Sequence, residues 1–110
     1  MQYLKQTYFR SVKHLKNVAS LPCQVCGLDG QTQAAHSNWV QWGGKCKGKK
    51  ASDEYTAAMC QHCHYEIDQG GKLDKAERQK IWLAAHRETV RKLQALGLWP
   101  VDVPLPEGLT

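Results

Sequence analysis

Apolar residues recur at helical spacing near the N-terminus of the chain, with lysines and arginines on the remaining positions. This pattern predicts a helix over residues 3–19, which Leu21-Pro22 ends. The basic residues form either a solvated surface or a surface that faces phosphate groups. The apolar positions are Leu4, Tyr8, Val12, Leu15 and Val18.

A second and longer helical pattern occupies residues 74–96. Asp74 is a suitable N-cap, and Glu77, three residues later, completes a capping box. Gly97 suits the position after the helix, and Pro100 prevents continuation. Because the apolar residues form one stripe, we expect this helix to pack on the core. The stripe consists of Ile81, Trp82, Ala85, Thr89, Leu93 and Leu96.

The segment between these helices predicts shorter elements. Residues 32–40 can form a strand that carries His36, residues 53–59 a turn or short helical segment, and Cys63 to about Asp68 a helix that Gly70-Gly71 ends. The chain is therefore expected to be one small α+β domain over residues 1–99. Its core would cover about residues 20–70, and residues 100–110 would form an extended tail.

Two histidines and two tryptophans in the helical regions carry separate expectations. His14 and His86 lie within the predicted helices, and we expect both at the surface. Trp82 and Trp99 leave a homodimer open as an alternative to purely internal packing.

Four cysteines form two C-x2-C pairs, Cys23 with Cys26 and Cys60 with Cys63. Each two-residue spacer lets both sulfurs reach one tetrahedral ion, so the quartet predicts a structural zinc site. A small core often needs such a staple. The sequence has neither a signal-peptide pattern nor a long apolar run, which predicts a cytoplasmic protein with reduced thiols and no membrane partner. Cys46 belongs to neither pair.

The formal net charge is +5 and the isoelectric point is about 9.0. A positive surface favours nucleic acid as a partner. Glycines and lysines in residues 43–52 predict a flexible loop that follows a DNA backbone, with Trp39 and Trp42 before it to stack on bases. A solvated loop and two core tryptophans are the alternatives. The expected DNA-binding residues are Lys45, Lys47, Lys49, Lys50 and Trp42.

Beside the second cysteine pair, His64 and Asp68 have the i, i+4 spacing that places both on one helix face. An imidazole and a carboxylate suit a divalent metal that keeps positions open for water and phosphate. His36, on its strand, could face the same point. The ordinary alternatives are a spare zinc ligand for His64 and a buried structural role for His36. His62, inside the cysteine pair, is expected to point to solvent.

This layout resembles the HNH endonuclease family, which has the ββα-metal fold. It is most similar to the small phage and prophage members, including the YbcO-like nucleases. The resemblance covers roughly residues 10–70, and its most specific part is the stretch from the second cysteine pair onward. The matching pieces are Cys23-Gln24-Val25-Cys26, Ala35-His36, the Gly/Lys-rich loop, Asp53, and Cys60-Gln61-His62-Cys63-His64-Tyr65-Glu66-Ile67-Asp68.

The resemblance implies an endonuclease that hydrolyses phosphodiester bonds in DNA. His36 matches the general base that deprotonates the attacking water, and His64 matches the histidine linked to a catalytic divalent metal such as Mg²⁺ or Mn²⁺. The cysteines would hold zinc beneath that site.

Two positions depart from the family pattern. Ala35 stands where many members have an acidic or histidine metal ligand, and Tyr55 stands where the central Asn is usual. Asp53 or Glu54 can substitute for that Asn, with Asn38 as a more distant alternative. Metal binding and catalysis would then involve Asp53 and Asp68 beside His64. If these departures abolish cleavage, the same scaffold would be a zinc-stabilised DNA-binding module. A zinc-stapled protein-interaction module is the third alternative.

Overall fold

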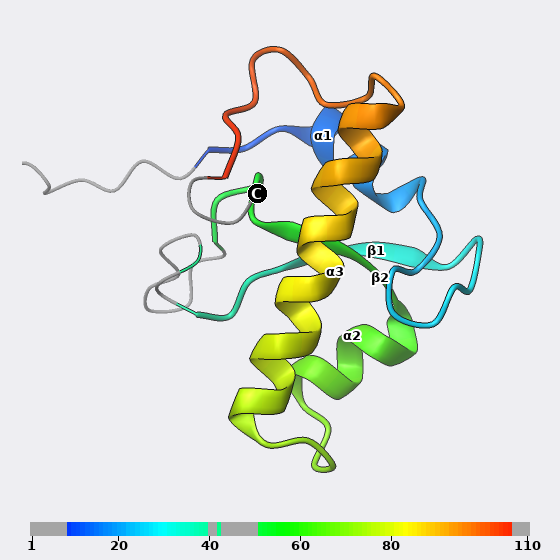
Figure 1. Ribbon diagram of the computed structural model, residues 1–110, viewed down its shortest axis with the longest axis vertical. Coiled ribbons are helices and arrows are strands. Elements are labelled where there is room, and N and C mark those ends of the chain that lie inside the picture. The colour runs from blue at the N-terminus through cyan, green and yellow to red at the C-terminus, as the bar shows by residue number, and fades with distance from the viewer. Residues whose placement is uncertain (1–8, 40–41, 43–50, 107–110) are drawn as a thin grey trace, which may run out of the picture.

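The computed structural model describes residues 9–39, 42 and 51–106. Within these residues the chain forms three helices and a two-stranded antiparallel sheet, so the predicted α+β class is confirmed (Figure 1). No helix in the described part of the chain is long and apolar enough to cross a membrane. The elements follow the order α1 (Val12–Ala19), β1 (Thr32–His36), β2 (Thr56–Cys60), α2 (Gln61–Asp68) and α3 (Lys75–Ala95).

The sheet is a hairpin in which β1 pairs with β2 from Thr32 opposite Cys60 to His36 opposite Thr56. The prediction of a turn or helical segment at 53–59 is therefore wrong. All five β2 residues are buried, so β2 lacks the alternation of polar and apolar residues that identifies a half-exposed strand. The predicted strand over 32–40 ends earlier, at His36.

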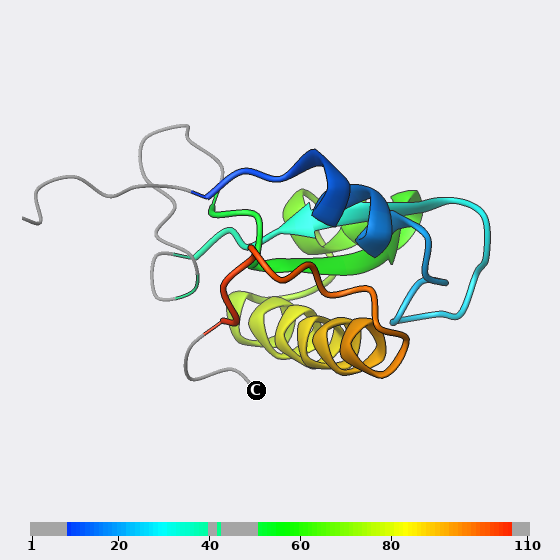
Figure 2. The ribbon, with the colours of Figure 1, turned by 90° about the horizontal axis from the view of Figure 1, so that it is seen from above.

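Helices surround the hairpin on three sides. α1 lies on one face and α2 on the other, while α3 runs along β2, as the two views together show (Figures 1 and 2). The backbone N–H of Ala58 in β2 donates to Thr89 Oγ1 of α3 at 2.9 Å. α3 thus satisfies a polar group at the outer edge of β2, which would otherwise be buried without a partner.

The first helix starts later than the sequence suggests. Ser11 is its N-cap, and its side chain accepts from the backbone N–H of His14. Residues 9–11 of the predicted helix over 3–19 are therefore not helical, and residues 1–8 lie outside the described part. The segment before α1 is held by another partner, since the N–H of Phe9 donates to Ser52 Oγ at 2.6 Å. Those contacts replace the intrahelical bonds that the spacing predicted.

The longest helix agrees with its prediction. Asp74 and Glu77 form the reciprocal capping box, and the helix closes with Leu96 as C-cap. Gly97 follows at a φ of 72°, a conformation that favours glycine. The apolar stripe packs inward at Trp82, whereas Leu96 is 61% exposed. α2 also begins two residues earlier than predicted, at Gln61.

Both histidines that were expected at the surface are fully buried, so that prediction is wrong. His86 stacks on Trp82 with ring centroids 4.8 Å apart, and Tyr55 lies on it at 6.0 Å. His14 packs edge-on against Trp99 at 4.5 Å. Both imidazole rings are thus buried against aromatic side chains, and a helical pattern in the sequence does not reveal such contacts. The burial of Trp82 also removes it from any dimer surface.

The C-terminal segment is not an extended tail over residues 100–106. The indole N–H of Trp99 donates to Val103 O at 2.9 Å, closing a turn. Val103 and Pro106 are buried against the domain. Residues 51 and 52, assigned to the flexible basic loop, are buried as well. Residues 43–50 and 107–110 lie outside the described residues.

Candidate metal centre and histidine pairs

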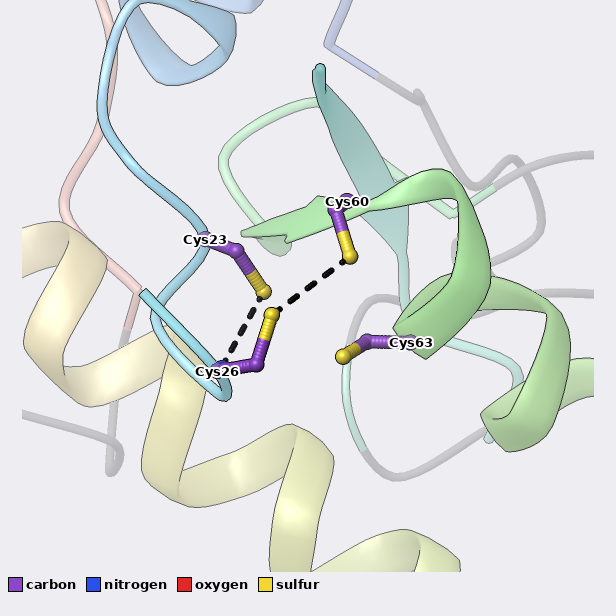
Figure 3. Close-up of side chains that lie close together, drawn as sticks. All are labelled: Cys23, Cys26, Cys60 and Cys63. Carbon is purple, nitrogen blue, oxygen red and sulfur yellow. Dashed lines mark hydrogen bonds between the residues drawn. The ribbon is translucent and has the colours of Figure 1, made fainter. Parts of the chain in front are cut away.

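The four paired cysteines converge, as the sequence predicted (Figure 3). Cys23 and Cys26 lie on a tight turn in which the N–H of Gly27 donates to Cys23 O at 2.9 Å and Gly27 has a φ of 84°. Cys60 ends β2 and Cys63 lies in the first turn of α2. The four sulfur atoms all lie within 4.8 Å of one another. This set can hold a metal ion. A ligand set of four cysteine sulfurs in tetrahedral coordination favours zinc.

The electrostatics of the cluster also suit a cation. Burial opposes ionisation of Cys23, but backbone N–H groups, including those of Cys26 and Val25, lower the pKa of its thiol to about 6. Burial and the neighbouring sulfurs raise the pKa of the Cys63 thiol. Four thiolates in one cluster repel one another, so a bound cation is what would hold all four ionised.

His36 is paired with Asp53. Its Nε2 lies 2.8 Å from Asp53 Oδ1, so the ring N–H donates to the carboxylate. The Asp53 side chain is 4% exposed and the His36 side chain 15%. Donation from Nε2 fixes the tautomer of the neutral ring and makes Nδ1 the nitrogen that accepts a proton.

Asp53 joins three segments through its carboxylate. Arg10 Nη1 donates to Oδ1 at 3.2 Å and to Ala51 O at 2.5 Å. The backbone N–H of Ser11 donates to Oδ2 at 2.7 Å. His36 and the guanidinium of Arg10 therefore share one carboxylate oxygen. The Arg10 side chain is 46% exposed. No local pattern indicates this role of Arg10, because its partner lies more than forty residues away along the chain.

His64 is paired with Asp68 on the same face of α2, as the spacing predicted. His64 Nε2 lies 3.0 Å from Asp68 Oδ2, and Nδ1 lies 2.8 Å from Gln33 Oε1. Asn38 Nδ2 donates to the other oxygen of Asp68. When Nδ1–H donates to Gln33, the lone pair of Nε2 faces a carboxylate. In that tautomer, the Nε2 lone pair and the Asp68 carboxylate oxygen can both serve as ligands of one metal cation.

The two pairs do not form one cluster. Side chains alternate along a strand, so Gln33 and Ala35 share one face of β1 and His36 the other. The contacts agree, because Gln33 meets His64 of α2 whereas His36 meets Asp53, which binds the start of α1. Among the described residues, the cysteines are the one group of three or more metal-ligand side chains. The expectation that His36 and His64 face one point is therefore not met.

The structure also places two other residues discussed from the sequence, Trp42 and His62. Trp42 stacks on Trp82 with centroids 5.5 Å apart and packs against the core, which favours the core alternative over base stacking. His62 is exposed, as expected. The four lysines of the predicted DNA-binding loop, Lys45, Lys47, Lys49 and Lys50, lie outside the described residues.

Comparison with known proteins gives no match to any family model, curated protein or solved structure.

Proposed function

We propose that this protein is a metal-dependent endonuclease of the HNH type that hydrolyses phosphodiester bonds in DNA. The observation that carries the proposal is the pairing of His36 with a buried Asp53 at the end of β1. The order β1, β2, α2, braced by two cysteine pairs, agrees with the ββα arrangement that the resemblance implies.

His36 would act as the general base that deprotonates the attacking water. Imidazole has a pKa near neutrality, which suits proton transfer at physiological pH. Asp53 would hold the ring in one tautomer and stabilise the imidazolium that forms after proton transfer. A carboxylate bound to histidine has this positioning role in other hydrolytic sites.

Arg10 would bind a DNA phosphate next to His36. Its guanidinium is anchored to Asp53 and Ala51, yet almost half of its side chain is exposed. A guanidinium suits phosphate because its planar N–H donors match the oxygens in pairs. The net charge of +5 would attract the polyanion from a distance.

His64 and Asp68 would hold a divalent metal such as Mg²⁺ or Mn²⁺, with Gln33 fixing the His64 ring. Mg²⁺ is commonly held by one or two protein ligands together with water and phosphate oxygens. When bound, the metal would neutralise charge on the phosphate and leaving oxygen. Asn38, which already donates to Asp68, would keep that carboxylate in place.

His36 and Asn38 are only two residues apart, so their backbones are separated by at most roughly 7 Å. Asp68 reaches this end of the hairpin through Asn38, whereas His64 lies against Gln33, three residues before His36 along β1. A phosphate at this end would have the base on one side and the metal on the other. This arrangement is the geometric requirement that the proposal places on the substrate.

A zinc-stabilised DNA-binding module is the second candidate. Ala35 faces α2, where a metal ligand is usual in the HNH family, and it is 1% exposed within the core. The catalytic metal would then have fewer protein ligands than in that family. Such a module would bind DNA in a salt-dependent manner without cutting it.

The test is nicking of supercoiled plasmid by the zinc-loaded protein with added Mg²⁺ or Mn²⁺. We expect wild type to nick, and His36→Ala to lose about 100-fold or more in rate while keeping its DNA affinity. His62→Ala is the matched control, since His62 is exposed beside the cysteines. If wild type binds DNA but cuts with no divalent metal, the binding module is correct. If binding shows no salt dependence, neither DNA function holds.

A further inference from the structure

A pocket of about 520 Å³ lies between the segment after β1, the C-terminal end of α2 and the first turn of α3. The proposed reaction uses Asp68 and Asn38 on the rim of this pocket but assigns no role to Trp39, which forms part of its wall. The pocket lining combines an aromatic ring, apolar side chains, two amides, a carboxylate and two cationic side chains. The residues that matter here are Asn38, Trp39, Ile67, Asp68, Leu73 and Lys75.

The apolar wall is rigid. Trp39 packs edge-on against the buried Trp82, with ring centroids 6.1 Å apart, and remains partly exposed on the pocket side. Ile67 is 3% exposed and forms part of the same wall. A ring held by the core gives a planar ligand a stacking surface without ordering a mobile side chain.

The rim is polar and carries fixed contacts. Asn38 donates to Asp68, so a loop and a helix are joined at the edge of the pocket. Arg78 donates to the carbonyl oxygens of Gly70 and Leu73, which fixes the turn between α2 and α3. Lys75 is exposed beside this turn and supplies a positive charge. The combination of a flat apolar surface, hydrogen-bonding groups and the cationic side chains of Lys75 and Arg78 complements a nucleobase with its phosphate.

We propose that this pocket binds one unpaired nucleotide of the DNA substrate, with the base against Trp39 and a phosphate near Lys75. The inference rests on the proposed action on DNA. Asp68 lines the pocket and also contacts His64, so the bound nucleotide would lie next to the pair proposed to hold the metal. The substrate class is then DNA with an unpaired nucleotide beside the cleaved bond.

A perfect duplex would enter this pocket poorly. Its bases are stacked and paired, and extracting one costs a few kcal/mol before any contact is gained. A single strand, flap or bulge has already lost that pairing. Discrimination therefore depends on the substrate form rather than on the base sequence.

The experiment compares two fluorescein-labelled DNA hairpins of equal length, one fully paired and one with a single unpaired nucleotide. Affinities are measured by fluorescence anisotropy without added divalent metal, so that no cleavage occurs. We expect wild type to bind the unpaired form about 5-fold more tightly or better, since base–aromatic stacking has that order of effect. Lys75→Glu and Trp39→Leu should bring the ratio of the two affinities close to unity.

Lys72→Glu is the matched control, because Lys72 is an exposed lysine in the same turn and makes the same change in charge. This substitution should weaken binding to both DNA hairpins equally and leave the ratio of the two affinities unchanged. Trp39→Phe, which preserves a ring, should keep most of the ratio, and circular dichroism establishes that each variant is folded.

Equal affinities in wild type would overturn the pocket assignment, and so would a ratio that survives Lys75→Glu in a folded protein. Plasmid nicking separates the two proposals. Nicking with equal affinities leaves the nuclease and removes the nucleotide pocket. A preserved ratio without nicking supports the pocket and removes the nuclease.

Discussion

The cysteine cluster and the two histidine pairs occupy the same small hairpin unit, yet they are organised differently. The cysteines bring four ligand atoms to one point from a turn, a strand end and a helix start. The histidines divide into two carboxylate-bound pairs, one facing α1 and the other facing α2. The cysteines form one complete set of ligands. The two histidine pairs are separate, and they would act together only on a ligand that contacts both.

This difference separates stability from chemistry. A closed set of four sulfurs has no position left for a substrate, which is typical of a structural metal. The histidine pairs retain exposure, with 15% for the His36 side chain and 27% for that of His64. Substitutions that disrupt one region should therefore leave the properties of the other region measurable.

The largest effect is expected at the cysteine centre. Cys60→Ser removes a buried ligand, and structural zinc sites contribute on the order of 10 kcal/mol of apparent folding free energy. We expect loss of bound zinc and of the cooperative thermal transition in circular dichroism. Cys46→Ser, at a cysteine outside both pairs, is the control and should retain zinc. A folded, zinc-free Cys60→Ser protein would contradict the role of the cluster as the staple.

The cysteine centre was predictable because its signal is local. A C-x2-C spacing fixes two ligands in one turn, and the capping box of Asp74 and Glu77 is fixed within one helical turn. The arrangement of the histidines depends on strand alternation and on contacts between distant segments. Asp53 contacts Arg10 and His36 only in the folded hairpin. The sequence therefore indicates Asp53 as a candidate site residue but not the partners that it binds.

Asp53 provides the next largest effect. Asp53→Ala would leave His36 and the N–H of Ser11 without their carboxylate, and breaking a buried charged pair costs roughly 3 to 5 kcal/mol. We expect a matching fall in the free energy of unfolding in urea, together with loss of plasmid nicking. Asp68→Ala is the counterpart in the exposed pair and should cost less than about 1 kcal/mol. Equal losses would abolish the distinction between a buried and an exposed pair.

Acid should destabilise the protein through its buried histidines. Burial lowers the pKa of His86 from 6.5 to about 4, and burial also lowers that of His14. The unfolded chain therefore binds more protons than the folded chain between pH 6.5 and about 4, so stability falls as the pH decreases through this range. For His86 alone the loss is about 3 kcal/mol.

Urea unfolding at pH 7 and pH 4.5 measures this loss. His86→Phe keeps a ring against Trp82 and should reduce the difference between the two pH values. His62→Gln, at an exposed histidine, should leave that difference at the wild-type value. A wild-type stability that rises on acidification would contradict the burial of these imidazoles.

The smallest effect is expected at the start of α3. Asp74→Ala removes the N-cap of α3 and should lower the free energy of unfolding by about 1 kcal/mol. The exposed Asp102 is a suitable control, and Asp102→Ala should change the melting temperature little. Zinc content and nicking should be unchanged in both variants. Loss of zinc in Asp74→Ala would mean that α3 and the cysteine centre are coupled more tightly than their contacts indicate.

The positions that sequence patterns missed share a physical cause. β2 is buried on both faces and has Ala57 and Ala58 at its centre, so neither its period nor its composition identifies a strand. His14 and His86 are buried by aromatic rings from Trp99, Tyr55 and Trp82, which no local pattern places beside them. In each case a tertiary contact decides what the local sequence leaves open.

The proposed function divides two roles: the cysteines would brace the fold, and the histidine pairs would act on DNA. Its most direct test measures zinc content by mass spectrometry and plasmid nicking on the same samples of wild type, His36→Ala and His64→Ala. We expect about one zinc per chain in all three proteins, with nicking in Mg²⁺ or Mn²⁺ by wild type alone. Zinc loss in the histidine variants, or undiminished nicking by His36→Ala, would contradict it.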